Sequence, residues 1–145
     1  MKVYLGGPIE GLPLDVVKEW RETATTFYQN WFLERASSNP YVKTIDPCRR
    51  KAFHDEPYSS NLAHRIVQLD TNDIANSDLV LCNLKDRGQG KCWGSVMELV
   101  IAKQLGKPVI TILEEGYHHP FVEVYSTEIH HTLEDGLNAS LGYFR

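Results

Sequence analysis

Short apolar runs alternate with long helical patterns along this chain, and this alternation constrains the fold more than any other feature. Strand signals lie at Lys2–Leu5, Val42–Ile45, Leu79–Leu84 and Val109–Leu113, with a weaker one at Val122–Tyr125. Strands that alternate with helices pair in parallel, and the crossover helices cover both faces of the sheet. We therefore expect an α/β fold of the Rossmann or flavodoxin type, with one domain over residues 1–145 and a five-stranded, mostly parallel sheet.

Two of the segments between strands have the spacing of amphipathic helices. From about Leu14 to Ala36, one apolar stripe runs along the predicted helix, and we expect it in the core. Its members are Val17, Trp20, Ala24, Phe27 and Trp31. The second helix, Asn61–Ala75, has an apolar face made of Leu62, Ala63, Ile66, Val67, Leu69 and Ile74.

Asp70 falls near the middle of that second apolar face, and Asp73 lies at its flank. A carboxylate on a buried helix face is costly unless it is paired or hydrogen-bonded. Asp70 is therefore either a structural carboxylate, bonded to a loop or a buried cation, or part of a pocket wall. The residues alone leave both interpretations open.

Charge and composition disfavour several kinds of partner. The net charge is −4 and no basic run is present, which argues against binding a nucleic-acid polymer. No stretch approaches the length that spans a membrane. The three cysteines form no C-x-x-C pair, which is typical of reduced thiols in the cytoplasm. The adjacent pairs His118-His119 and His130-His131 lack the helical spacing of a zinc site, so we expect no metal and no cofactor.

Glycine-rich segments follow the first and third predicted strands. These are "GGPIEG" after Leu5 and "KDRGQGKCWGS" after Leu84. In open parallel sheets, ligands bind at the carboxyl ends of the strands, and glycines let the backbone approach them. The polar segment Pro47–Ser60, which contains Arg49, is long enough to act as a lid over such a site.

Glu98 stands among apolar residues just after the second glycine segment, and two interpretations compete for it. Ser95-Val-Met-Glu98 fits the S-x-x-E capping box, with Ser95 as N-cap and Glu98 at N3. Alternatively, Glu98 lies where this class of sheet holds its ligands, and is part of the chemistry. Both hold if the helix N-terminus keeps Glu98 ionised and reactive.

Three segments together resemble the nucleoside 2-deoxyribosyltransferase family, including related nucleotide N-glycoside hydrolases. They are "VYLGGPIEG", "DTNDIANSDLVLCNL" and "GSVMELVIAKQLGKPVITI", which in this order span most of residues 1–113. The matching positions are Tyr4 with Gly7, Asp70 eight residues before Asp78, Gly94-Ser95, Glu98, and Gly106-Lys107-Pro108-Val109.

The resemblance implies roles for individual residues. Glu98 would be the nucleophile that attacks the anomeric carbon, Asp70 would assist proton transfer to the leaving base, and Tyr4 would orient Glu98. The implied substrate-binding residues are Gly7, Pro8, Ile9, Gly11, Asp73, Gly94, Ser95 and Arg49. The implied partner is a small nucleoside or nucleotide, and the implied assembly is a homodimer or larger homo-oligomer.

The sequence departs from the family pattern at two positions. Cys92 stands where many transferases carry an Asp, and Val100 stands where Gly is common. We therefore keep three functions open. The first is transfer of 2′-deoxyribose between nucleobases through a covalent glycosyl-Glu intermediate. The others are hydrolysis of a nucleoside 5′-monophosphate, and sensing or sequestering of a nucleotide derivative without catalysis.

Overall fold

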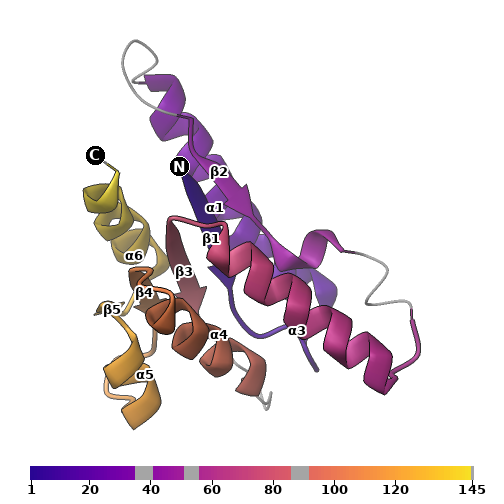
Figure 1. Cartoon of the computed structure of the whole chain (residues 1–145). Helices are drawn as coiled ribbons and strands as arrows, with labels where there is room; N and C mark the ends of the chain where they lie inside the picture. Colours follow the sequence, from indigo (N-terminus) through magenta and orange to yellow (C-terminus); the bar gives the residue numbers. More distant parts are fainter. Residues whose placement is uncertain (35–40, 51–55, 86–91, 145) are drawn as a thin grey trace.

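The computed structural model describes residues 1–34, 41–50, 56–85 and 92–144. Its strands are β1 (Lys2–Gly6), β2 (Lys43–Ile45), β3 (Leu79–Asn83), β4 (Val109–Ile112) and β5 (Glu128–His130). Its helices are α1 (Leu14–Glu34), α3 (Ser60–Ala75), α4 (Trp93–Gln104), α5 (Pro120–Tyr125) and α6 (Leu133–Ser140), with 3₁₀ turns η1 (Pro47–Arg49) and η2 (Leu141–Tyr143) (Figure 1). Within the described ranges, no helix is both long enough and apolar enough to cross a lipid bilayer.

The strands form a five-stranded sheet in the order β2-β1-β3-β4-β5, and every neighbouring pair is parallel. The predicted α/β fold is therefore confirmed, and four predicted strands match to within one residue at each end. From β1 the chain goes to β2 on one side, and β3 returns to the other side of β1. Such a change of direction leaves a crevice at the carboxyl ends of the strands, which is where this class of sheet binds ligands.

The weakest strand prediction is wrong. Val122–Tyr125 lies in α5, and the edge strand is β5, a few residues later. Pro120 takes the first helical position, where its fixed φ suits a helix and its missing N–H is not needed. The apolar run that resembled a strand is a short helix with Val122 buried and Val124 67% exposed.

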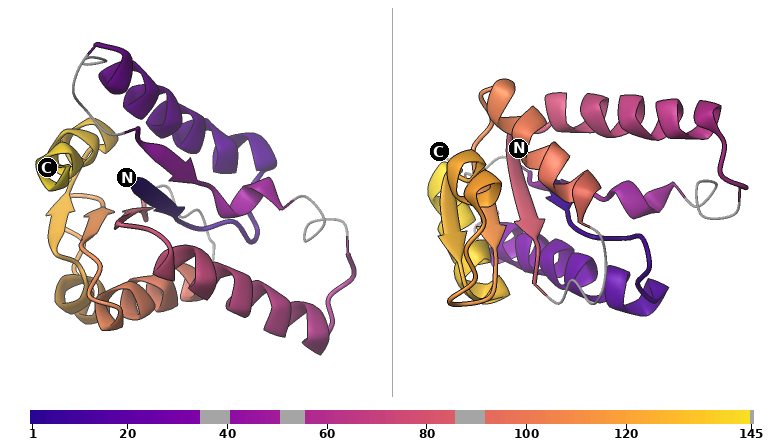
Figure 2. Two further views of the ribbon diagram at one scale, coloured as in Figure 1. Left: turned by 45° about the horizontal axis from the view of Figure 1, so that its top comes forward. Right: turned by 90° about the horizontal axis from the view of Figure 1, so that it is seen from below.

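Two apolar cores lie on opposite faces of the sheet, and neighbouring residues of each strand point to opposite cores. The core beneath α3, α4 and α5 receives Tyr4, Val80 and Cys82. The core beneath α1 and α6 receives their neighbours, such as Leu5 and Leu81. Figure 2 shows the two helical layers on either side of the sheet. Because the central strands are buried on both faces, they read as continuous apolar runs.

Both amphipathic helices form, but their buried residues differ in part from the predicted stripes. In α1, Val17 and Ala24 are buried as expected. Arg21 and Tyr28, which lie outside the stripe and carry polar groups, are also buried. In α3, Leu62 and Ile74 are buried, while Val67 is 62% exposed. The predicted lid, Pro47–Ser60, begins with the 3₁₀ turn η1, and its residues 51–55 lie outside the described residues.

Gly7 follows β1 and cannot be replaced without strain. Its φ is 155°, and a Cβ at this position would lie 2.8 Å from the backbone oxygen of Asn83 and 3.0 Å from the Trp20 ring. The loop therefore packs directly against the end of β3, and only glycine allows this approach.

We predict that Gly7→Ala destabilises the protein more than Gly116→Ala. Gly116 also has a positive φ, 76°, but open space surrounds its Cβ position. Gly116→Ala should therefore lower the free energy of unfolding only by the cost of the positive φ, about 1 kcal/mol. Gly7→Ala adds a steric clash and should lower it by about 2–3 kcal/mol. Urea unfolding of both variants measures this difference. Equal losses would contradict the close packing of Gly7 on Asn83.

Candidate functional site

A pocket of about 520 Å³ opens at the carboxyl ends of β1 and β2, on the side of the sheet covered by α3 and α4. It lies in the crevice expected for this topology, and its volume is in the range of small-molecule sites. The loop after β1, the turn η1, α3 and the first turns of α4 form its walls. The lining residues are Gly7, Pro8, Ile9, Glu10, Pro47, Tyr58, Ile66, Asp70, Gly94, Ser95 and Glu98.

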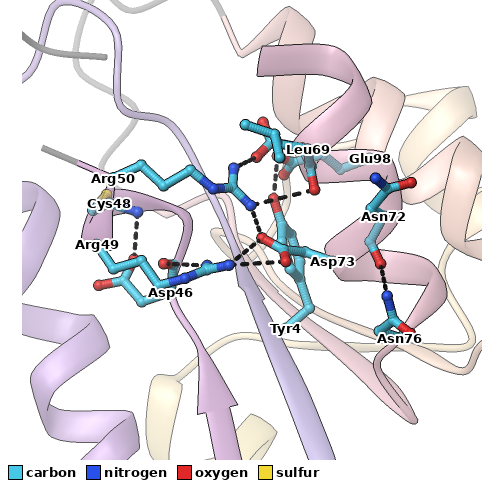
Figure 3. Close-up of polar contacts among 11 residues, drawn as sticks. Tyr4, Asp46, Cys48, Arg49, Arg50, Leu69, Asn72, Asp73, Asn76 and Glu98 are labelled. Atoms are coloured by element: carbon cyan, nitrogen blue, oxygen red, sulfur yellow. Dashed lines mark hydrogen bonds and ion pairs between the residues drawn. The ribbon is translucent and has the colours of Figure 1, made fainter. Parts of the chain in front are cut away.

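Glu98 is anchored to the sheet. The Tyr4 hydroxyl donates a hydrogen bond of 2.7 Å to Glu98 Oε1, joining β1 to α4 (Figure 3). Glu98 Oε2 is buried and has no hydrogen-bond partner among the described residues. The Tyr4 side chain is fully buried beneath the pocket, so the carboxyl group is held from the sheet side.

The predicted capping box is wrong. Helix α4 begins at Trp93, and its N-cap residue, Cys92, makes no side-chain capping bond. Ser95 and Glu98 lie within the helix, and Glu98 turns toward Tyr4 on β1. Because the helix starts earlier than the S-x-x-E pattern suggests, Glu98 cannot reach a free N–H of the first turn.

Burial, and not the helix N-terminus, controls the ionisation of Glu98. Loss of hydration raises the pKa of Glu98 to about 8. The hydrogen bond from Tyr4 and the positive charge of Arg21 lower this pKa, and the negative charge of Asp70 raises it. Glu98 lies beyond the first turn of α4, where the helix dipole acts weakly, so the expectation that the helix N-terminus keeps Glu98 ionised is wrong.

Gly6 makes room for this carboxyl group. A Cβ at Gly6 would lie 3.0 Å from Glu98 Oε2 and 3.5 Å from the sulfur of Cys82. Any side chain on the last residue of β1 would therefore push the carboxyl group away from the sheet. The sequence analysis missed this glycine, although it adjoins Gly7.

Asp70 contributes a second carboxyl group to the pocket, from α3. Its Oδ1 accepts a hydrogen bond of 2.6 Å from Nη1 of Arg50. Burial raises the pKa of Asp70, and the hydrogen bond and charge of Arg50, with a smaller effect of Arg49, oppose that rise. Asp70 therefore fits both alternatives from the sequence. It pairs with a cation, as a structural carboxylate would, and it also forms part of the pocket wall.

The predicted site residues fall into two groups. Those that line the pocket are Gly7, Pro8, Ile9, Asp70, Gly94, Ser95 and Glu98, with Tyr4 directly beneath. Gly11, Asp73 and Arg49 do not line it. Arg49 instead donates two hydrogen bonds of 2.8 Å to Asp73 (Figure 3). The glycines Gly88 and Gly90 lie outside the described residues.

Five residues of the site were not singled out individually by the sequence. Glu10, Pro47, Tyr58 and Ile66 line the pocket, and Arg50 holds Asp70. The sequence placed Glu10 in the glycine segment after β1, and Pro47, Arg50 and Tyr58 in the predicted lid. It placed Ile66 on the helix face that carries Asp70, one turn away.

Arg21 supports the pocket from the opposite face of the sheet. Its guanidinium, only 1% exposed, donates to the backbone oxygens of Val17 and Gly7, at 2.6 and 3.0 Å. It also forms an ion pair of 3.3 Å with Asp46, which caps η1 through the Cys48 N–H. One buried cation thus fixes both the loop after β1 and the turn that carries the two arginines.

The pocket is acidic. Its lining includes Glu10, Asp70 and Glu98 but, among the described residues, no lysine or arginine. Across the same ranges, no group of three or more His, Cys, Asp or Glu side chains is arranged to hold a metal ion. The chemistry available from these residues is therefore that of three carboxyl groups, the phenols of Tyr4 and Tyr58, and the Ser95 hydroxyl.

Comparisons with known proteins are informative at the level of the fold. The sequence matches no protein-family model, and it matches no curated protein. A 2-deoxyribosyltransferase from Bacillus psychrosaccharolyticus has a similar structure, with a TM-score of 0.63 and 17% identity over 97% of this chain and 96% of that one. A CMP N-glycosidase from Clostridium botulinum gives 0.57 and 15% over 97% and 98%. A conserved protein from Enterococcus faecalis V583 gives 0.65 and 16% over 94% of each chain.

The chain therefore shares the Rossmann-like fold of the deoxyribosyltransferases and N-glycosidases along nearly its whole length. At these identities the likeness concerns the fold. The activity has to be argued from the pocket itself.

We predict that Tyr4→Phe raises the pKa of Glu98 further, because the lost hydrogen bond lowers it in the native protein. The variant should also lose about 1 kcal/mol or more of stability. Tyr28→Phe is the matched control, since it removes another buried tyrosine bond, 2.8 Å long, to Ser140. In a carboxyl ¹³C NMR titration, the midpoint of Glu98 should move upward in Tyr4→Phe and stay unchanged in Tyr28→Phe. An unchanged midpoint would contradict the Tyr4–Glu98 bond.

Proposed function

We propose that this protein cleaves the N-glycosidic bond of a 2′-deoxynucleoside and transfers the deoxyribose to another nucleobase. The observation that carries the proposal is the Glu98 carboxyl group, held by Tyr4 in a pocket that also contains Asp70. Two carboxyl groups facing one pocket are the functional groups that glycosidic cleavage with retention requires. The fold shared with a deoxyribosyltransferase and a CMP N-glycosidase supports the same chemistry.

The reaction proceeds in two displacements. The Glu98 carboxylate forms a bond to C1′ of the sugar while the C1′–N bond breaks, and the Asp70 carboxylic acid gives its proton to the departing base. In the second step a new base attacks C1′ through nitrogen, its proton passes to Asp70, and the Glu98 carboxylate is released. Attack by water in place of the base would make the protein a hydrolase.

This mechanism requires one proton on the two carboxyl groups together. Glu98 must be ionised and Asp70 protonated when the bond breaks, although Glu98 is the more basic group in the ligand-free pocket. Because the two charges interact, their titrations belong to the pair. The pKa of Glu98 is about 8, so the pair should lose its last proton near this pH. We therefore expect kcat/KM to fall above about pH 8.

The acidic lining favours a nucleoside over its 5′-monophosphate. A phosphate would enter a pocket lined by Glu10, Asp70 and Glu98, and no lysine or arginine is among the described lining residues. Arg49, the cation implied by the family resemblance, is bonded to Asp73, and its neighbour Arg50 is bonded to Asp70 and Asp73. Hydrolysis of a monophosphate and non-catalytic binding are the alternatives that the experiment must exclude.

The decisive test incubates the protein with 2′-deoxyadenosine and a different free base, followed by chromatography. We expect a new deoxynucleoside, and we expect the nucleoside to react at least as well as its 5′-monophosphate. Release of adenine alone would identify a hydrolase, and a strong preference for the monophosphate would favour the nucleotide hydrolase. Tight binding without turnover would indicate a sensing module.

We predict that Glu98→Gln lowers turnover by about 10³-fold or more, because a neutral amide is a poor nucleophile. The variant should also resist alkaline pH. The native pKa of Glu98, about 8, exceeds its ordinary value of 4.5, so the folded state holds the extra proton between these pH values and loses stability as the pH rises through this range. The glutamine amide carries no such proton.

Melting temperatures at pH 5 and pH 8.5 therefore test the buried acid independently of turnover. The melting temperature of Glu98→Gln, relative to that of the native protein, should be higher at pH 8.5 than at pH 5. Glu22→Gln, on the exposed side of α1, is the control and should change neither turnover nor pH dependence. Substantial activity in Glu98→Gln would remove Glu98 as nucleophile.

A further inference from the structure

Arg50 lies where the end of η1 meets α3, and no sequence motif singled it out. Its guanidinium contacts three acceptors on α3. Nη1 donates to Asp70 Oδ1 at 2.6 Å, and Nη2 donates to the Leu69 backbone oxygen at 3.2 Å and to Asp73 Oδ2. The Arg50 side chain is 13% exposed and Asp70 is 20% exposed, so water screens this contact less than a surface pair.

Arg49, its neighbour, makes a useful contrast. Arg49 donates to both oxygens of Asp73 and to the Asp46 backbone oxygen, so its hydrogen bonds go to acceptors other than Asp70. It is 46% exposed. The two arginines thus tie the same turn to the same helix, where both bond to Asp73 (Figure 3). Arg50 is the one that also bonds to Asp70, the carboxyl group that lines the pocket.

We propose that Arg50 is a positioning residue for Asp70, which it holds in the orientation from which Asp70 passes a proton to the departing base. The inference rests on the proposed function. Arg50 occupies Oδ1, which leaves Oδ2 as the oxygen that carries the proton. The bonds to Leu69 and Asp73 fix the guanidinium itself, so the Asp70 side chain cannot rotate without breaking a clamp of three contacts.

The charges around Asp70 give Arg50 a second effect. The groups that face it are Arg49 and Arg50 from η1, Asp73 on its own helix, Glu98 from α4, Tyr4 from β1 and Glu10 across the pocket. Burial raises the pKa of Asp70 and Arg50 opposes this most strongly. Arg50 therefore holds the pKa of Asp70 below the value that burial alone would give it.

Two substrates separate positioning from general support. 2′-Deoxyguanosine needs a proton on its leaving base, whereas 7-methyl-2′-deoxyguanosine carries a positive charge on the base and leaves without one. We expect Arg50→Met to lower kcat for 2′-deoxyguanosine about 10- to 10²-fold, the lower end of what proton transfer contributes. For the 7-methyl substrate the loss should stay below about threefold, since that base needs no proton from Asp70.

Arg49→Met is the matched control, with the same change one residue earlier in the same turn. It should leave both rates within about threefold of the native protein, since Arg49 bonds to Asp73 and not to Asp70. If Arg50→Met slows both substrates equally, or if Arg49→Met reproduces its pattern, Arg50 only supports the turn and the proposal is overturned.

A carboxyl ¹³C titration of the full chain tests the same contact without turnover. The Asp70 midpoint should move upward in Arg50→Met and by a smaller amount in Arg49→Met, because Arg49 has only a minor effect on this pKa; a shift in Arg50→Met no larger than that in Arg49→Met overturns the proposal. Should Arg50→Met fail to fold, Arg50→Lys keeps the charge but loses the multiple contacts, and should show the same split between substrates. If the native protein turns over neither substrate, the proposed function fails, and the titration still decides whether Arg50 controls Asp70.

Discussion

A carboxyl group buried against the last residue of a central strand is the constraint on which the rest of the site depends. Glu98 occupies the space that Gly6 leaves empty and accepts the Tyr4 hydrogen bond. Both contacts come from β1, which pairs with β2 and β3. The group therefore cannot move without disturbing the centre of the sheet, and such rigidity is what a reactive side chain requires.

A buried acid of this kind needs charges arranged around it, and the fold supplies them from both faces of the sheet. Arg21 lies on the α1 side, bonds to the loop after β1 and pairs with Asp46. Arg50 lies on the α3 side and bonds to Asp70. Asp46 connects the two, because it caps the turn that ends at Arg50. The loop, the turn and the pocket-lining face of α3 are thus joined by one chain of polar contacts that starts from Arg21 in α1.

The sequence predicted the parts of this structure that follow from local pattern. Alternating strands and helices indicated the parallel sheet, and family-like segments pointed to Tyr4, Asp70 and Glu98, which the structure brings around one pocket. The capping box failed because S-x-x-E matches by chance inside a helix that starts at Trp93. The strand at Val122–Tyr125 failed because Pro120 started a helix there.

The ion-pair network could not be predicted, since it depends on which residues distant in sequence meet. Arg49 and Arg50 are adjacent and chemically identical, yet Arg50 bonds to both Asp70 and Asp73 while Arg49 bonds to Asp73, a difference set by the course of η1 across α3. The family resemblance implied that Arg49 binds the ligand, whereas the structure bonds Arg49 to Asp73. With both guanidinium groups engaged by aspartates, the lining of the pocket stays acidic. The surrounding charges then control the ionisation of Glu98 and Asp70, and the acidic lining is the reason why we propose an uncharged nucleoside as the substrate.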